Sequence, residues 1–151
     1  MKMSGEEIIA ADRATVWAAL NDPDVLEACI PGCKSLEKRS DTELAATVSL
    51  GIGPVRANFD GEVQLVNMNP PESYRLEGEG KGGVAGFASG GADVRLEEVE
   101  EGTRLLYDVD AKVGGKIAQV GARLIDSTAK KLAKKFFADF KAKVEGEGET
   151  S

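Results

Sequence analysis

Hydrophobic and polar positions follow two different periods along this chain. Between residues 44 and 113 apolar and polar residues alternate, the pattern of strands that bury one face of a sheet and expose the other. From Lys116 to Val144 the apolar residues recur every three to four positions, as in an amphipathic helix. The period changes at Gly114 and Gly115. This order predicts an α+β domain in which one long C-terminal helix lies across a single curved antiparallel sheet.

The first thirty residues predict one strand and two short helices. The strand is expected over residues 5–10. A helix over 13–20 follows Asp12, a suitable N-cap, and a second helix over 23–28 begins with Pro23, which the first helical position favours. Alternation marks the further strands over 44–52, 55–65, 74–77, 92–97 and 104–113.

Length and charge describe one acidic domain with a basic final helix. The 151 residues suit a single domain over 1–144, followed by a polar tail over 145–151 that we expect to be disordered. The net charge of -7 argues against nucleic acid as a partner, because phosphate binding needs a basic surface. Residues 1–111 hold 10 Lys or Arg against 21 Asp or Glu, whereas residues 112–144 hold 9 against 2.

Residue types limit the chemistry that the chain can perform. The chain has no histidine, which excludes Ser-His and Cys-His nucleophiles and imidazole zinc sites. Cys29 and Cys33 are too few for a disulfide framework and supply only two soft ligands, so we expect free cysteines and no metal site. Neither a membrane span nor a signal-peptide core is present in the sequence, so we expect a cytoplasmic protein.

Glycines on the inward-facing side of the strands leave two explanations open. Gly61, Gly78 and Gly80 continue the inward parity of their strands. Glycine inside a strand permits a bend, and it also leaves space for another group to approach the backbone. The first turns of the final helix carry small residues such as Gly121, while its end is bulky. The pattern therefore fits curvature alone, or curvature together with room for a ligand.

The final helix also carries basic residues along one line. At about 100° per residue they fall within a narrow arc away from the apolar positions, with Phe137 close by. The residues of this basic ridge are Lys116, Arg123, Lys130, Lys134 and Lys141. A solvated charged face is one interpretation. A docking strip for an anionic membrane or an acidic partner protein, with Phe137 as an inserted anchor, is the other.

Seven short motifs occur in an order that extends over nearly the whole chain. They are VWAALNDP (16–23), ACIPGC (28–33), GFASG (86–90), YDVDA (107–111), VGGKIAQ (113–119), RLID (123–126) and FF (136–137). With these motifs the sequence resembles the CoxG family of carbon monoxide dehydrogenase subunits, within the START-like (SRPBCC) superfamily. Each motif alone is weak, but their order makes the resemblance fairly specific.

The resemblance implies a helix-grip fold, in which a seven-stranded antiparallel sheet holds a C-terminal helix over a hydrophobic pocket. It also implies an accessory role beside a molybdenum-containing hydroxylase of the carbon monoxide dehydrogenase type. In the family that role looks like recruitment of the enzyme to the membrane, together with binding of a quinone or another apolar ligand. Some relatives carry a C-terminal extension with an apolar anchor. Because this sequence stops at Ser151, we expect any contact with the inner face of the cell membrane to be reversible, through the basic ridge.

Our leading hypothesis is a non-catalytic protein that binds a quinone or lipid and needs no other cofactor. Strict alternation from Val94 would turn Phe87 outward unless Gly90 and Gly91 form a bulge, so Phe87 is the least secure ligand residue. A buried tyrosine hydroxyl, from Tyr74 or Tyr107, could donate a hydrogen bond to a quinone oxygen. The expected ligand-binding residues are Phe59, Tyr74, Phe87, Tyr107, Ile117, Gly121 and Leu124.

Two other classes of function stay open. A ligand-free interaction module would act through the basic ridge alone. A cyclase or hydrolase would need an acid or base inside the apolar pocket, and the inward positions carry almost no carboxylates.

Overall fold

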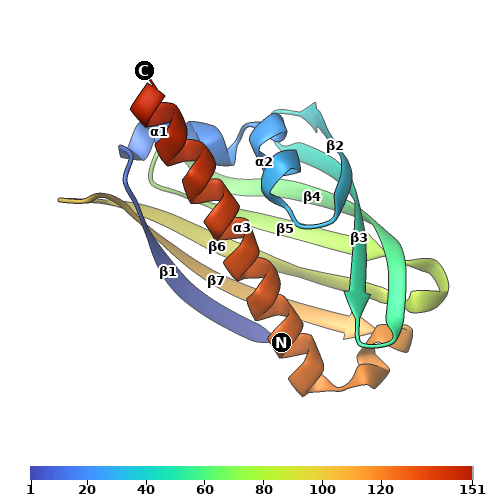
Figure 1. The fold of residues 1–151 in the computed structure, drawn as a ribbon. Helices are drawn as coiled ribbons and strands as arrows, with labels where there is room; N and C mark the ends of the chain where they lie inside the picture. The colour runs from blue at the N-terminus through green and yellow to red at the C-terminus, as the bar shows by residue number, and fades with distance from the viewer. Residues whose placement is uncertain (151) are drawn as a thin grey trace.

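One long helix lies across one face of a curved antiparallel sheet of seven strands (Figure 1). The computed structural model describes the backbone of residues 1–150 and the side chains through residue 146. The strand order is β1-β7-β6-β5-β4-β3-β2, which leaves β1 and β2 at the edges. The predicted helix-grip fold is therefore confirmed. The elements are β1 (Lys2–Ile9), α1 (Arg13–Leu20), α2 (Pro23–Cys29), β2 (Cys33–Ser40), β3 (Glu43–Ile52), β4 (Val55–Asn69), β5 (Ser73–Lys81), η1 (Gly83–Ala85), β6 (Phe87–Val99), β7 (Gly102–Gly114), η2 (Gly115–Val120) and α3 (Ala122–Thr150).

The two short helices form where local capping favours them. The Asp12 side chain accepts a hydrogen bond of 2.8 Å from the backbone N–H of Thr15 and begins α1. Asp22 caps α2 in the same way, through the backbone N–H of Asp24. Both helices lie at the end of the sheet where the C-terminal half of α3 ends (Figure 1). They close this end of the interior, and the prediction of a strand followed by two short helices is confirmed.

Among the described strands, β2 is the one that the alternation pattern misses. Its partner in the sheet is β3, and six of its eight residues are exposed. An edge strand that buries few side chains has no need of alternating apolar residues, so its sequence carries little strand signal.

The final helix differs from its predicted bounds at both ends. Residues Gly115–Val120 form the 3-10 helix η2, and α3 begins only at Ala122. Gly121 separates the two with a φ of 97°, a conformation that breaks a right-handed helix. Lys116 therefore does not share the helical face of the basic ridge. At the other end the helical backbone continues through Thr150, into the segment predicted as a tail, and Ser151 lies outside the described residues.

Contacts at its C-terminal half hold α3 to the start of the chain. The Glu145 carboxylate accepts a hydrogen bond of 3.0 Å from the backbone N–H of Ala10, and Val144 is fully buried. Within residues 1–150, none of the helices has the length and apolar character needed to cross a bilayer.

Candidate functional site

The apolar interior between the sheet and α3 is divided into two separate clusters. The larger cluster lies at the α1 and α2 end and includes Phe137, Phe140 and Val144 of α3. The smaller cluster lies at the opposite end and is formed by Ile52, Phe59, Ala85 and Ile117, with Leu124 packed against it. The expected ligand residues are divided in the same way, so they do not form one site.

Between the two clusters the inner face of the sheet carries many glycine and alanine residues, with Val63 beside Gly78 and Val113 beside Ala88. Strand pairing aligns Gly61 with Ala46 on one side and with Gly80 on the other, and Gly80 with Ala88. The next row aligns Gly78, Gly90 and Ala111. We call the space over these rows the central groove. The small residues of its lining are Ala46, Gly61, Gly78, Gly80, Ala88, Gly90, Ala92 and Ala111, all of which keep partial solvent exposure.

The described side chains of α3 leave the space above the glycines of this groove unfilled. A methyl group added at Gly61 would lie 3.8 Å from the carbonyl oxygens of Ala46 and Glu79 and would meet no other described neighbour within 4 Å. A methyl group added at Gly80 would meet only Phe59 and Asp60 among the described residues, at 3.9 and 4.0 Å. The extensive close approaches of the α3 backbone are instead with α1, α2, β1, β3 and η2. The helix therefore rests on the ends and edges of the sheet, and the sheet centre stays open beneath it.

The two tyrosines stand beside the groove, at the larger cluster. Tyr74 is buried edge-on against Trp17, with ring centroids 5.2 Å apart. Tyr107 is partly buried, and its hydroxyl lies over Gly5 at the β1 edge. Burial raises the pKa of the Tyr107 phenol, and the nearby Glu7 carboxylate raises it further. Both phenols therefore stay protonated at neutral pH, and the less buried Tyr107 is the more accessible donor.

Phe59, Ile117 and Leu124 come together in the smaller cluster and close the far end of the groove. Gly121 adjoins this group at the junction of η2 and α3, where a methyl group would meet none of the described residues within 4 Å. Four of the seven expected residues thus line one end of the interior, and the two tyrosines line the other.

The expectation for Phe87 is wrong. The register between β6 and β7 continues without a bulge from Val99 to Phe87, so the alternation holds and Phe87 faces outward. Its side chain is 52% exposed and lies over Gly114 on the outer face of the sheet.

The role expected for Phe137 as a membrane anchor is also wrong. Phe137 is only 9% exposed and packs against Tyr107 and Phe136. At about 100° per residue, Phe137 lies only about 60° around the helix from fully buried Phe140, so its ring also turns into the core.

Four of the five residues of the predicted basic ridge lie on α3, and Lys116 lies on η2. Arg123, Lys130 and Lys134 are exposed and form no ion pair with the described residues. Lys141 differs, because its ammonium lies 2.9 Å from the Glu7 carboxylate of β1. The exposed charge of the ridge is therefore concentrated in the N-terminal half of the helix.

The sequence reasoning did not select the alanines of the groove. Alternation along their strands places Ala46, Ala92 and Ala111 on the same inner face as the glycines, so this pattern alone could have identified them as groove residues. Large residues drew attention because ligand pockets are commonly lined with them, but here the space comes from residues that lack side chains or carry only a methyl group.

The outer face of the sheet holds a polar depression of about 430 Å³. At its centre the Arg75 guanidinium contacts carboxylates from three strands, namely Glu77, Asp93 and Asp110, at 3.0 to 3.3 Å. A second depression, of about 470 Å³, lies between the β1–α1 and β6–β7 connections. The first depression shares Gly78 and Gly90 with the lining of the central groove, and the second lies away from it.

Comparison with known proteins identifies the family of the chain. The family model that matches is that of CoxG, a subunit of carbon monoxide dehydrogenase, and the match extends over residues 5–145. No curated protein sequence matches the chain. A conserved protein from Geobacillus kaustophilus of known crystal structure is 31% identical, with a TM-score of 0.90 over 97% of this chain and 96% of that one.

More distant structures share the fold alone. A protein from Thermus thermophilus, TTHA0849, is 15% identical, with a TM-score of 0.72 over 97% of this chain and 99% of that one. Ara h 8.0201 is 14% identical, with a TM-score of 0.67 over 97% of this chain and 98% of that one.

Proposed function

Because the chain belongs to the CoxG family of carbon monoxide dehydrogenase subunits, we propose that it is a non-catalytic accessory protein of a molybdenum-containing enzyme of that type. In this role it binds an apolar small molecule, a quinone or a lipid-like compound, in the central groove. It also helps to bring the enzyme to the membrane, acting from the cytoplasm as a reversible peripheral protein.

The unfilled space above Gly61 and Gly80 is the observation that carries the ligand-binding part of this proposal. A helix that packed directly on the sheet would place side chains within contact distance of an added methyl group, and the described part of α3 places none there. Curvature alone does not require such a gap. A flat apolar ring suits a surface of glycine and alanine, because it can lie against backbone that no large side chain covers.

Tyr107 supports a ligand that carries a carbonyl oxygen. On the inner face of the sheet Val94 of β6 lies between Tyr107 and Tyr74, and the protonated hydroxyl of Tyr107 lies over Gly5 of β1. A quinone offers both the flat apolar ring and the oxygen that such a donor needs.

Ligand extraction and groove-filling variants test this part of the proposal. We expect mass spectrometry of organic extracts of the purified protein to find a quinone or lipid, and menaquinone or ubiquinone to bind when added. Gly61→Leu and Gly80→Leu should abolish binding, because their Cβ atoms fit without a clash and their side chains enter the groove.

Asn58→Leu is the matched control, because it places the same side chain on the outer face of β4 and should leave binding unchanged. An empty wild-type protein that binds neither quinone nor lipid would refute the ligand-binding role. Filling variants that bind as well as the wild type would show that the ligand sits elsewhere.

A ligand-free interaction module is the second candidate, and the exposed cations of the basic ridge favour it. Lys130 and Lys134 could contact an acidic surface of the dehydrogenase. Lys130→Glu with Lys134→Glu should abolish dehydrogenase binding in a pull-down. If that double variant still binds quinone, the ridge and the groove act separately. An enzymatic role is less favoured, because the described residues in the rows of the groove are glycine, alanine and other apolar residues.

A further inference from the structure

Three connections meet at the end of the sheet farthest from α1 and α2. They are the β3–β4 turn, the segment with η1 between β5 and β6, and the segment with η2 between β7 and α3 (Figure 1). The β3–β4 turn lies against Leu124, since a methyl group added at Gly53 would come 2.8 Å from that side chain. The backbones at Gly86 and Gly115 also touch. We call residues 51–57, 81–88 and 112–124 the loop end.

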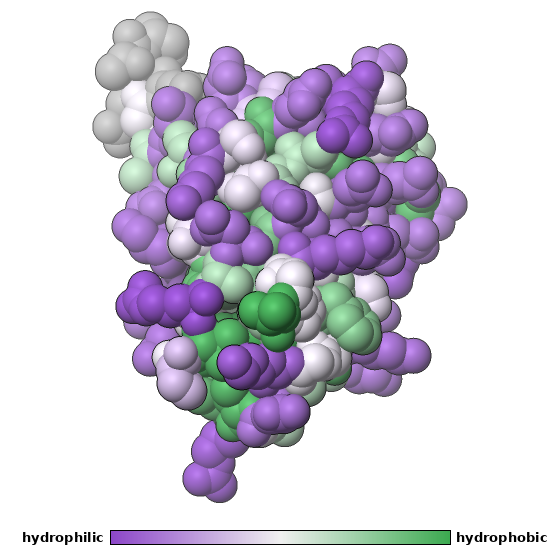
Figure 2. Space-filling model, turned by 90° about the vertical axis from the view of Figure 1, so that its right-hand side faces the viewer, coloured by the Kyte–Doolittle hydropathy of each residue, from purple (hydrophilic) through white to green (hydrophobic). Residues whose placement is uncertain are grey.

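The loop end exposes large apolar side chains to solvent. Val84 is 93% exposed on η1 and Phe87 is 52% exposed beside it, and they are the large apolar residues most exposed among those described. Gly83 and Gly86 have φ values of 62° and 115°, so the chain makes a sharp turn that projects Val84 outward. Figure 2 shows apolar residues gathered on the lower half of this side of the molecule. Exposed apolar groups of this kind commonly mark a binding surface.

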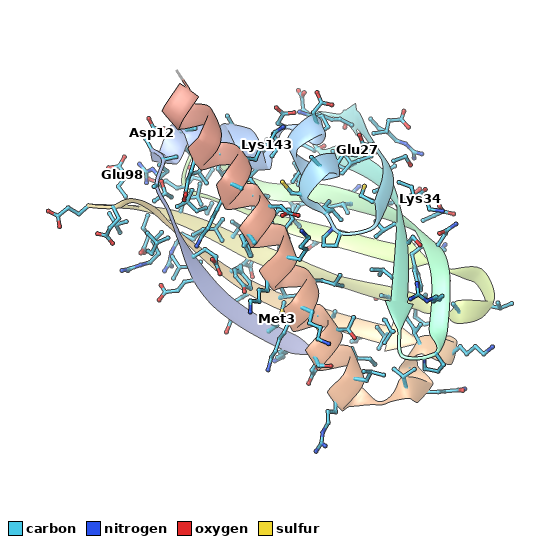
Figure 3. All side chains as sticks on the ribbon, in the orientation of Figure 1. Met3, Asp12, Glu27, Lys34, Glu98 and Lys143 are labelled. Carbon is cyan, nitrogen blue, oxygen red and sulfur yellow. The ribbon has the colours of Figure 1, made fainter. Side chains whose placement is uncertain are left out.

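Every ionisable residue of the loop end is positively charged. The three segments contain no aspartate or glutamate, although the whole chain has 26 of them. Their five cations are Arg56, Lys81, Lys112, Lys116 and Arg123. Lys81 has a partner in Glu79 at 3.7 Å, and the other four form no ion pair with the described residues. The acidic residues lie elsewhere, and Figure 3 shows Asp12 and Glu98 at the opposite end of the molecule.

Basic side chains lie next to the exposed apolar side chains of the loop end. Phe87 pairs with Gly114 on the outer face of the sheet, and the next outward pair is Ser89 with Lys112. Lys116 is exposed on η2 and Arg123 on the first turn of α3, on either side of buried Ile117. Exposed apolar side chains surrounded by cations can bind the interface of an anionic bilayer. The Val and Phe side chains would enter the boundary of the acyl chains, and the Lys and Arg side chains would contact the headgroups.

We propose that the loop end inserts into an anionic lipid surface, with Val84 and Phe87 entering the bilayer interface and the surrounding cations binding acidic headgroups. This inference rests on the proposed function, because it specifies which surface of the accessory protein meets the membrane. It assigns the loop end, including Lys116 and Arg123, to the membrane, and leaves Lys130 and Lys134 of the basic ridge to the partner enzyme. It also places the smaller cluster and the adjoining end of the central groove next to the lipid, where an apolar ligand could enter without crossing water.

Vesicle flotation with the full chain tests the assignment. We expect the wild type to float with vesicles made of about 70% phosphatidylcholine and about 30% phosphatidylglycerol, and not with pure phosphatidylcholine. Val84→Asp should reduce flotation about tenfold, and Lys112→Glu with Lys116→Glu should reduce it at least as much. Lys38→Glu reverses one lysine at the end of β2 that pairs near Leu44, away from the loop end, and serves as a control that should bind normally.

The ridge variant Lys130→Glu with Lys134→Glu distinguishes this proposal from membrane docking through α3. If it loses flotation while Val84→Asp and the Lys112 and Lys116 double variant keep it, the assignment to the loop end is overturned. A wild type that ignores anionic vesicles overturns it as well.

A second measurement reports insertion directly. Val84→Trp should show a blue-shifted emission on addition of anionic vesicles and quenching by brominated lipids, over the constant background of Trp17. An unchanged spectrum would contradict insertion. Quinone binding is measured separately, so its loss in the groove variants leaves the vesicle result standing.

Discussion

The ring of Tyr107 stacks on the ring of Phe137, with centroids 5.1 Å apart and an angle of 23° between the ring planes. This contact joins the middle of β7 to the C-terminal half of α3. Phe136 meets Phe137 edge-on and stacks on Phe140, so the aromatic group continues along the helix. The helix is thus fastened to the sheet at one end by aromatic packing, while the groove next to it stays open.

Phe137→Ala should lower the free energy of unfolding by about 3–5 kcal/mol, because it removes a buried ring and leaves a cavity. Urea denaturation measures the change. Phe87→Ala removes the same ring from an exposed position and should cost less than about 1 kcal/mol. Equal losses in the two variants would contradict the position of Phe137 in the core.

Tyr74→Phe should change how stability depends on alkaline pH. Burial raises the pKa of the Tyr74 phenol well above its ordinary value near 10. In the unfolded chain the phenol ionises near pH 10, whereas in the folded protein it stays protonated. The wild type therefore loses stability as the pH rises above about 10 toward the folded-state pKa, and it loses none from this group below that range.

Urea midpoints of the wild type and Tyr74→Phe at about pH 8 and about pH 11, on either side of the ordinary phenol pKa, check this expectation. Ionisation of lysines affects both proteins equally, so only the difference between them matters. We expect the wild type to lose more than the variant. Identical losses would show that Tyr74 ionises as freely in the folded protein as in the unfolded chain.

Arg75→Met should make stability depend on salt. The guanidinium neutralises Glu77, Asp93 and Asp110 on the outer face of the sheet, and these hydrogen bonds raise the pKa of Arg75. Without it the carboxylates repel one another, and salt screens that repulsion. The urea midpoint of the variant should be lower than that of the wild type. It should recover partly when sodium chloride is raised from about 20 mM to about 500 mM, because the screening length shortens with salt and is roughly 10 Å at about 0.1 M. Arg95→Met, which removes a pairing with Glu97 alone, is the control and should show little recovery.

Cys29 and Cys33 should react slowly with iodoacetamide in the native protein. Both are free, and burial raises the pKa of each thiol, which lowers the fraction of reactive thiolate. Cys29 is buried and Cys33 is only partly covered, so we expect Cys33 to be modified first. Mass spectrometry after timed quenching measures the order. Modification of Cys29 at the rate seen in urea would contradict its burial in the native protein.

The strands could be predicted from the sequence wherever one side chain in two is buried. Strict alternation from Val94 indicated that Phe87 points outward. The expectation that Phe87 binds the ligand went against this pattern and was wrong. β2 gave no such signal because an edge strand buries few side chains. The break between η2 and α3 at Gly121 was not predicted, because the sequence pattern does not show that this glycine has a positive φ angle.

The candidate site was harder to predict than the fold. Periodicity assigns residues to a face, but it does not give their position along the groove, so Tyr74 and Phe59 were placed in one site although they stand at opposite ends. The loop end was missed for a related reason. Its cations come from three connections far apart in the sequence, and only the strand pairing brings them to one surface.

The two edge strands of the sheet determine whether another molecule can add a strand to it. β2 has two register shifts against β3, between Cys33 and Ser35 and between Lys38 and Ser40, and it exposes charged residues along its length. Irregular backbone and charge at an edge oppose the addition of a further strand from another molecule. On the other side, α3 lies close to β1, and Lys141 reaches across to Glu7. Growth into a continuous intermolecular sheet is thus disfavoured at both borders, which leaves the protein free to carry an apolar tip without aggregating through its strands.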